Sequence, residues 1–336
     1  MITFVVRRLA AAVVLLFVVS SATFVIFFVI PKLGGQTPEQ LAMQYMGKSP
    51  TPEAVAAAVH SLGFDRPVYV QYGNWLHTLL AGGDFDTGTV VKHCPAPCLG
   101  FSLRDQVAVL PRVTDAFPVT LSLTIGASVL WLLFGVAAGV LSALRPHSLF
   151  DRLAMGTALA GVSVPIFVTA PLVLLLVVYK GNLLPHPAYH PFFGDPFLWA
   201  QGLLLPWIVL AFQFAALYAR LTRAGMLDAI GEDYIRTARA KGLSERRVMA
   251  KHALRAVLTP VLTIFGMDFG LLLGGAVLTE SSFDLHGIGK VAIDGIGNND
   301  LPVVLGVVLF AATFIILANL IVDLLYGVID PRVRKE

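Results

Sequence analysis

Long apolar runs separated by short polar segments dominate the pattern along the chain. Six runs carry few or no charges, and each is long enough to cross a bilayer, which takes roughly 20 residues. They are Leu9 to Ile30, Phe117 to Leu144, Leu153 to Tyr179, Pro196 to Ala219, Ala256 to Thr279, and Leu301 to about Val328. The pattern predicts six transmembrane helices and therefore an all-α integral membrane protein.

The first run, which follows Arg7 and Arg8, has two interpretations. Ser20, Ser21 and Ala22 offer small residues at which a secretory signal could be cleaved. The run is too long for a signal, and cleavage would leave only five spans. We therefore expect an uncleaved first helix.

Composition supports a membrane protein. Hydrophobic residues make up 57% of the chain and charged residues only 13%, with a mean hydropathy of +0.78. Soluble domains carry about 25% charged residues. The net charge of +3 adds little, because the distribution of the charges is more informative than their sum.

Lys and Arg residues are concentrated in alternate connecting segments. If the N-terminus is cytoplasmic, 16 of the 24 Lys and Arg residues lie on the cytoplasmic side, whereas the two short outer connections hold only Lys180 and Lys290. The long segment 31–116 is exempt from the positive-inside rule. We expect both termini and the polar segment 226–256 in the cytoplasm of a multi-pass cell membrane protein, with residues 31–116 outside.

These assignments divide the chain into three parts. Residues 1–30 form the N-terminal end and first helix, residues 31–116 form a small external subdomain, and residues 117–336 form a five-helix core. Within the subdomain, the pattern predicts one helix from Thr51 to Leu62 and a second over residues 71–80.

The only cysteines, Cys94 and Cys98, lie in the external segment within the sequence HCPAPC. A structural disulfide is expected in an oxidising compartment. A metal site that uses His93 is the alternative, but the sequence offers no further ligands nearby. His186 and His190, in a proline-rich connection, are interpreted as surface residues, so no metal is expected.

The stretch from Met226 to Pro260 is the one long charge-dense segment. It predicts two short helices. The apolar face of the first is expected to carry Leu227, Ile230, Tyr234 and Ala238. Gly242 would end that helix, and the Ser244 hydroxyl would cap the second, which continues to about Pro260. A DNA-binding helix-turn-helix is disfavoured because both flanks are membrane-spanning sequence.

The run EDYIRTARAKGLSERRV resembles the cytoplasmic coupling loop of ABC importer permeases, in particular the dipeptide, oligopeptide and nickel group. The family signature is Glu-Ala-Ala, three residues, then Gly. Ala238 and Gly242 match its second Ala and its Gly, and Arg236 and Thr237 stand at its first two positions, as in the peptide subgroup. The resemblance implies ATPase coupling by Glu232, Asp233, Tyr234, Arg236, Thr237, Ala238, Lys241 and Gly242.

Four further stretches resemble the same family, so the resemblance covers nearly the whole chain. They are LGFDRPVYVQYGNWLHTLLAGGDF, LPRVTDAFPVTLSL, ESSFDLHGIGKVAIDGIGNNDLP and DLLYGVIDPRVR. The chain departs from the family in its longer cysteine-containing segment and at Gly34 and Gly35, where Pro-Gly-Asp-Pro is frequent. The match is closest to the first of the two permease subunits, the dipeptide permease B type.

The resemblance implies a type I ABC importer permease that forms half of a pathway for di- or oligopeptides. Its expected partners are a second, homologous permease, two ATPase subunits or a fused pair, an external substrate-binding protein and the lipid bilayer, with no nucleic acid. ATP and Mg²⁺ would bind to the ATPase subunits, and no cofactor is expected in this chain. Nickel chelates or haem remain alternative cargoes.

Several residues within the apolar runs are candidates for lining the pathway or for helix packing. Pro165 is expected to kink the third span. Gly266, Gly270 and Gly274, at intervals of four, would leave one side of the fifth span open to another helix. Asp268, on roughly the opposite side, costs about 2.5–3.5 kcal/mol to insert, so it needs a wet cavity or a polar partner.

No catalytic apparatus is recognisable. Gly289 and Lys290 lack the preceding glycine of a phosphate loop, and HExxH and GxSxG motifs are missing. We expect a non-enzymatic subunit. Two functions of other classes remain as alternatives to an ABC permease. A secondary transporter would work without ATPases but usually shows more intramembrane charges. A membrane-embedded enzyme would need a nucleophile or a group of metal ligands.

Overall fold

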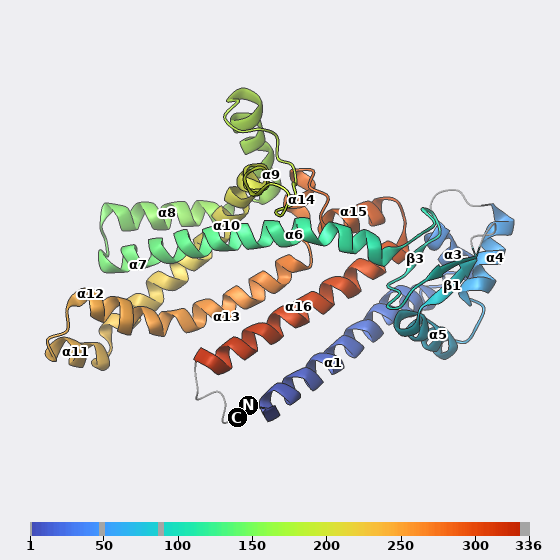
Figure 1. Cartoon of the computed structure of the whole chain (residues 1–336), viewed down its shortest axis with the longest axis horizontal. Helices are drawn as coiled ribbons and strands as arrows, with labels where there is room; N and C mark the ends of the chain where they lie inside the picture. Colours follow the sequence, from blue (N-terminus) through green and yellow to red (C-terminus); the bar gives the residue numbers. More distant parts are fainter. Residues whose placement is uncertain (1, 47–50, 87–90, 330–336) are drawn as a thin grey trace. The chain divides into compact units, whose positions relative to one another are not determined.

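The computed structural model describes residues 2–46, 51–86 and 91–329 (Figure 1). It contains two compact units. The first comprises residues 1–120, 273–277 and 286–336, and the second comprises residues 121–272 and 278–285. Helices predominate in the described residues, whose strands form two short antiparallel hairpins.

The first unit begins with α1 (Ile2–Phe24), a π-helical turn η1 (Val25–Val29) and α2 (Ile30–Leu33). Then come α3 (Pro38–Met46), α4 (Pro52–Leu62) and α5 (Val68–Ala81). The hairpins pair β1 (Gly83–Asp86) with β2 (Val91–Cys94), and β3 (Phe101–Ser102) with β4 (Val107–Ala108). The unit also holds the start of α6 (Val109–Trp131), α15 (Ile288–Gly297) and α16 (Leu301–Ile329).

Local sequence explains how the small helices of this unit begin. Thr37 and Gln40 form a reciprocal capping box before α3: the Thr37 amide donates to the Gln40 side chain at 3.0 Å, and the Gln40 amide donates to the Thr37 hydroxyl at 3.3 Å. Pro67 precedes α5, which therefore starts at Val68, three residues before the start expected from periodicity. The helix expected over residues 51–62 corresponds to α4.

An aromatic cluster forms the core beneath these helices. Phe24 and Phe28 of α1 and η1 stack with their ring centroids 4.7 Å apart, and Phe28 also contacts Phe64 and Trp75. Leu305 contributes to the same core from α16. The helices α1 and α16 lie side by side along their length (Figure 1). The subdomain is therefore packed onto one end of this helix pair.

Strand β3 is fixed to the start of α16 by a buried polar contact. The Ser102 hydroxyl donates to a carboxylate oxygen of Asp300 at 2.6 Å, and both residues are buried. Burial raises the pKa of Asp300, and the hydrogen bond from Ser102 opposes that shift. The contact joins residues that are 198 positions apart in sequence.

The second unit continues α6 through a π-helical turn η2 (Leu132–Val136) into α7 (Ala137–Leu144). It then contains α8 (Leu149–Ser163), α9 (Ile166–Val173), η3 (Leu174–Lys180) and α10 (Pro196–Gly231). After α11 (Asp233–Ala240) and α12 (Glu245–Arg247) come η4 (Val248–Ala253) and α13 (Leu254–Leu273). The short α14 (Val277–Ser282) follows.

Glycines let neighbouring helices approach α10 closely. A Cβ atom at Gly139 of α7 would lie 2.6 Å from the Ala219 carbonyl oxygen, and one at Gly161 of α8 would lie 3.0 Å from the Phe212 carbonyl oxygen. Such approach requires the absence of a side chain. The helices α7, α8 and α10 therefore form one tightly packed layer.

Five helices in the described residues are long and apolar enough to cross a membrane, or six if α8 and α9 with η3 form one bent span. The bend is 104°, sharper than the expected kink of a continuous helix. Its physical cause is Pro165, which lacks an amide hydrogen and forces the preceding residue, Val164, into an extended conformation (φ −99°, ψ 116°). Each half of the broken span is too short to cross alone.

The other predicted runs differ from the helices mainly at their ends. The run expected to end at Ala219 continues as α10 to Gly231. The fifth run, expected to reach Thr279, ends as α13 at Leu273, so Gly274 lies beyond the helix. The reason is the Gly274-Gly275 pair: Gly275 adopts φ 121°, a conformation that other residues rarely tolerate, and the helix stops before it.

The close packing of α7 on α10 predicts opposite effects for two glycine substitutions. Gly139→Ala should destabilise the protein by roughly 1–3 kcal/mol because the added methyl group meets α10. Gly156→Ala, on α8, should be neutral or stabilise by up to about 1 kcal/mol, since no atom lies within 4 Å of its Cβ position and alanine favours helix. Thermal unfolding in detergent, followed by circular dichroism, measures both. A shift of the same sign for the two variants would contradict the packing argument.

Candidate functional site

The polar loop, defined as residues 232–247, joins the end of α10 to η4 and α13. Figure 1 shows α10 and α13 running toward the loop that carries α11 and α12. The Asp195 carboxylate caps the start of α10 by accepting hydrogen bonds from the amides of Phe197 and Leu198. With 36 residues, α10 is about 54 Å long. One rigid element thus extends from Asp195 to the polar loop.

The helix α11 buries only two side chains, Ile235 and Ala238, which are 0% and 7% exposed. They lie on the side that packs against α10 and η4. Tyr234, expected on the apolar face, is instead exposed. The expectation was wrong because the helical period does not continue through Gly231 and Glu232, where α10 ends and the chain turns into a new helix.

A Schellman motif ends α11 at Gly242. The Leu243 amide donates to the Ala238 carbonyl oxygen at 3.4 Å, and the Gly242 amide donates to the Arg239 carbonyl oxygen at 2.9 Å. Gly242 has φ 78°, as this motif requires, and no atom lies within 4 Å of its Cβ position. The glycine expected to stop the helix does so in the left-handed conformation and faces open space.

A bidentate ion pair closes the turn after Gly242. The Arg239 guanidinium donates to both carboxylate oxygens of Glu245, at 2.7 and 3.1 Å. The Ser244 side chain does not cap α12 as expected, although Ser244 occupies the N-cap position. Glu245 stabilises the turn instead, through its ion pair with Arg239.

The helix after the turn also does not stop near Pro260, which lies inside α13.

The residues predicted to contact an ATPase share the outer surface of α11 and its turn. All except Ala238 are exposed: Glu232, Asp233, Tyr234, Arg236, Thr237, Lys241 and Gly242. The Arg236 guanidinium donates to the Asp233 carboxylate at 3.3 Å, and the Thr237 hydroxyl donates to the Asp233 carbonyl oxygen at 2.9 Å. The arrangement is a small rigid polar projection with one apolar side fixed to the helices behind it.

A second ion pair, absent from the sequence-based candidates, anchors α8 to α10. The Arg223 guanidinium donates to both carboxylate oxygens of Asp151, at 2.6 and 2.8 Å. The Asp151 side chain is only 5% exposed and also accepts a hydrogen bond from the His147 amide at 2.9 Å. Arg223 lies about two helical turns before Gly231, where α10 meets the polar loop.

One local signal could have singled out Asp151. Ser148 and Asp151 have the spacing of a capping box ahead of an apolar run, and the Ser148 side chain accepts from the Asp151 amide at 3.1 Å. The partner Arg223 is 72 residues away in sequence, and no local pattern identifies it.

Asp268 has a polar partner within the second unit. The Tyr218 hydroxyl donates to its carboxylate at 2.8 Å, and Tyr218 is fully buried. The Trp131 ring, also fully buried, lies 6.1 Å from the Tyr218 ring between centroids. Asp268 itself is partly buried. An aromatic cluster thus holds the hydroxyl that satisfies this carboxylate.

The remaining candidates within the apolar runs are not gathered at one place. Pro165 stands at the break between α8 and α9. Gly266 and Gly270 are buried on α13, whereas Gly274 lies beyond its end. Their assignment to a pathway stays a prediction.

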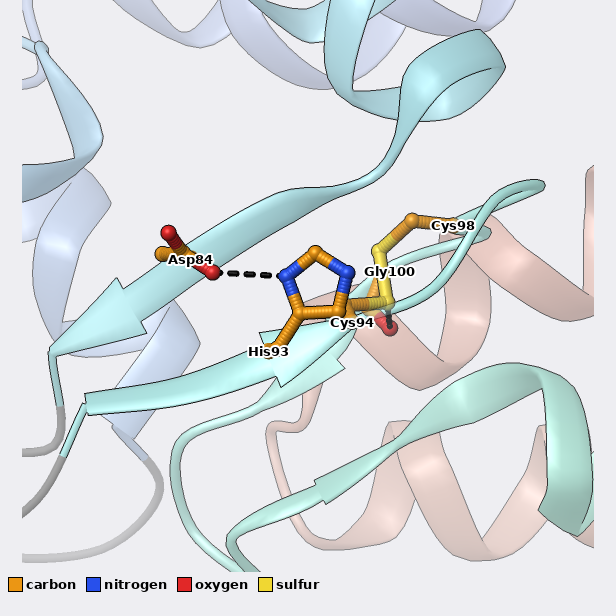
Figure 2. Close-up of a disulfide and its surroundings, with 5 residues drawn as sticks. All are labelled: Asp84, His93, Cys94, Cys98 and Gly100. Carbon is orange, nitrogen blue, oxygen red and sulfur yellow. Dashed lines mark hydrogen bonds and ion pairs between the residues drawn. A yellow bond between two sulfur atoms is a disulfide. The ribbon is translucent and has the colours of Figure 1, made fainter.

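Cys94 and Cys98 form a disulfide with an S–S distance of 2.02 Å in the first unit (Figure 2). The His93 Nδ1 lies 2.7 Å from the Asp84 carboxylate across the β1–β2 hairpin (Figure 2). In the part of the chain that the structure describes, no group of three or more His, Cys, Asp or Glu residues could hold a metal ion.

Comparison with known proteins places these features in a family. Residues 135–335 match the family described as "Binding-protein-dependent transport system inner membrane component". Residues 1–124 match the N-terminal family described as "Binding-prot-dependent transport system membrane comp, N-term".

Curated relatives match over their full length and over the whole of this chain. The dipeptide transport system permease protein DppB of Escherichia coli K12 is 36% identical over 359 aligned residues. The di/tripeptide transport system permease protein DppB of Pseudomonas aeruginosa UCBPP-PA14 is 38% identical over 357 residues. A putative peptide transport system permease protein of Brucella abortus 2308 is 36% identical over 336 residues.

The protein is a multi-pass membrane protein of the permease class. This conclusion rests on its apolar spans, on the polar projection after α10 and on the relatives that match over their full length. The chain belongs to the family of binding-protein-dependent transport system inner membrane components, which are permease subunits of ABC importers.

The buried ion pair predicts a local effect of Arg223→Gln. Loss of the guanidinium leaves the Asp151 carboxylate without its ion-pair partner, so the start of α8 should open more often. Hydrogen exchange of the amides of residues 147–152 should rise roughly tenfold or more, measured by mass spectrometry. The matched control is Arg220→Gln, an exposed position on the same helix. Equal hydrogen-exchange rates of these amides in the two variants would show that the Asp151–Arg223 pair does not anchor α8.

Proposed function

We propose that this chain is one of two permease subunits of an ATP-driven importer of short peptides. The support is twofold: the family and relatives named above, and a rigid polar projection on α11 at the end of α10. The projection is the feature on which the proposal depends, because a permease without an ATPase of its own needs an element that transmits movement.

The proposed assembly adds a second, homologous permease, two ATPase subunits or a fused pair, and an external substrate-binding protein. ATP and Mg²⁺ would bind in the ATPase subunits. Both termini and the polar loop would face the cytoplasm, and residues 31–116 would lie outside. The distribution of Lys and Arg supports this orientation.

The contacts of α11 support a lever mechanism. Its buried residues Ile235 and Ala238 face α10 and η4, so a push on α11 reaches both helices at once. The Schellman turn and the Arg239–Glu245 pair keep the projection from deforming. ATP binding would close the ATPases, move α11 and open the pathway outward, and hydrolysis would reset it.

The Asp151–Arg223 pair would transmit the movement of α10 to a further helix, α8. It ties the start of α8 to α10 about two turns from the polar loop, so α8 follows a movement of α10. A buried charged pair resists separation because each ion would be left unpaired.

Short peptides are the proposed cargo because the relatives named above carry dipeptide, di/tripeptide or peptide in their names. Among the residues that the structure describes, no feature favours nickel chelates or haem over peptides, and none favours a secondary transporter.

The cargo proposal predicts loss of dipeptide uptake when this chain is removed. Cells lacking it should stop accumulating a radiolabelled dipeptide such as Phe-Leu, and re-expression should restore uptake that depends on ATP. Loss of nickel or haem uptake with dipeptide uptake unchanged would refute the peptide assignment. Uptake that survives inactivation of the partner ATPases would refute the ABC mechanism.

The lever mechanism predicts that Gly242→Trp abolishes uptake while the chain remains inserted. Tryptophan is strained at a positive φ, at a cost of about 1–2 kcal/mol, and places a large ring on the docking surface. Gly242→Asn is the matched control, because asparagine tolerates this conformation and is small, so most uptake should remain. Immunoblots of membrane fractions measure insertion. Normal transport by the tryptophan variant would exclude the docking role.

A further inference from the structure

The first unit contains a cavity of about 310 Å³ that the proposed lever mechanism does not use. This volume lies at the lower end of the range for small-molecule sites. The residues around it come from α5, from the aromatic core below α5, and from the loop that carries the disulfide. Under the proposed orientation, the cavity lies on the external side.

One face of α5 forms the polar wall. Gln71, Asn74, Trp75 and Thr78 line the cavity, and their spacing of three and four residues places them on one side of the helix. The side-chain amide of Gln71 donates through Nε2 to the carbonyl oxygens of Phe64 and Arg66, at 3.2 and 2.8 Å, and so fixes the turn before α5. Asn74 is exposed and provides a polar side chain at the opening.

The opposite surface of the cavity is apolar. Phe28, Tyr45, Phe64 and Leu305 line it, and all four are buried members of the core of this unit. Trp75 adds an aromatic face that belongs to both surfaces. A ligand that fits must therefore have an apolar body and a polar part.

The disulfide loop forms the third wall, through Cys98, Gly100 and Phe101. The Cys98 amide donates to the Leu79 carbonyl oxygen at 3.1 Å, which joins the loop to α5. A Cβ atom at Gly82 would lie 2.6 Å from the Cys94 carbonyl oxygen, so this close approach requires glycine. Figure 2 shows the disulfide at the base of the β1–β2 hairpin. The cysteine-containing segment thus builds part of the cavity.

Two side chains of opposite charge line the cavity, and they differ in their partners. The Asp84 carboxylate is already paired with His93 at 2.7 Å. Arg66 is exposed, and the ion pairs among the described residues do not include it. A guanidinium at the edge of an apolar cavity suits a carboxylate, which it binds through two parallel hydrogen bonds.

We propose that this cavity binds a short apolar peptide, with its C-terminal carboxylate on Arg66 and its side chains against Trp75 and the apolar wall. The site would hold cargo on the external part of the permease, separately from the substrate-binding protein. This assignment of the ligand rests on the proposed peptide transport.

The test uses the full chain in nanodiscs without a binding protein, with Phe-Leu as the probe and saturation-transfer NMR as the readout. Wild type should transfer saturation to Phe-Leu, and Phe-Leu amide, which lacks the carboxylate, should bind roughly tenfold more weakly. Octanoate tests a simple amphipathic carboxylate. Binding of octanoate equal to that of Phe-Leu would overturn the peptide assignment.

Two pairs of variants locate the site. Arg66→Gln should weaken Phe-Leu binding roughly tenfold, whereas Arg104→Gln, outside the cavity in the same unit, should not. Asn74→Trp should fill the cavity and abolish binding, whereas Tyr69→Trp, at an outward position that is 78% exposed, should leave it unchanged. Equal effects within either pair, or no binding to wild type, would overturn the proposal.

Uptake measured in parallel separates this inference from the proposed function. Peptide uptake by cells with no Phe-Leu binding in nanodiscs would refute only the cavity site. Specific binding without peptide uptake would refute the transport proposal and retain the site.

Discussion

The close packing of α10 is the constraint on which the rest of the second unit depends. Gly139 and Gly161 bring α7 and α8 within backbone contact of α10, and Trp207 fills the space over Gly126 of α6. In a bilayer, where lipid competes equally for apolar surface, such contacts supply van der Waals attraction that larger side chains would prevent. Because α10 is packed so closely, it is a rigid helix that can move only together with α7 and α8. A projection at its end is then useful as a lever, because displacement is not absorbed by bending.

The two ion pairs near that end have different consequences because their exposure differs. Arg239 and Glu245 are accessible to water, so their attraction is screened, and their main effect is to fix the geometry of one turn. Asp151 is shielded and receives donors from both Arg223 and the His147 amide. Separation of that pair would leave a buried charge, so it joins α8 and α10 more firmly than a surface pair could.

The sequence allowed prediction of those features that the bilayer or local backbone chemistry dictates. Apolar runs must be helical in lipid, and Gly242 must end α11 because the turn needs a positive φ. Pro165 indicates where the third span bends, but neither the bend angle of 104° nor the extension of α10 to Gly231 follows from composition. The pairs Asp151–Arg223 and Tyr218–Asp268 join residues 72 and 50 positions apart, so periodicity could suggest a need for a partner but not its identity.

The π-helical turn η4 shapes the segment that follows the polar loop. Its buried residues are Val248, Met249 and Ala253. A five-residue separation does not repeat on one face of an α-helix, but it does in a π-helix, whose hydrogen bonds join residues five apart. The wider turn of the π-helix brings Val248 and Ala253 toward the same side of η4, and η4 packs against α11. In a regular α-helix, one of these two side chains would point away from the other, and the packing between η4 and α11 would be weaker. The irregular turn is therefore part of what holds α11 in place, and it lies where movement of α11 would enter α13.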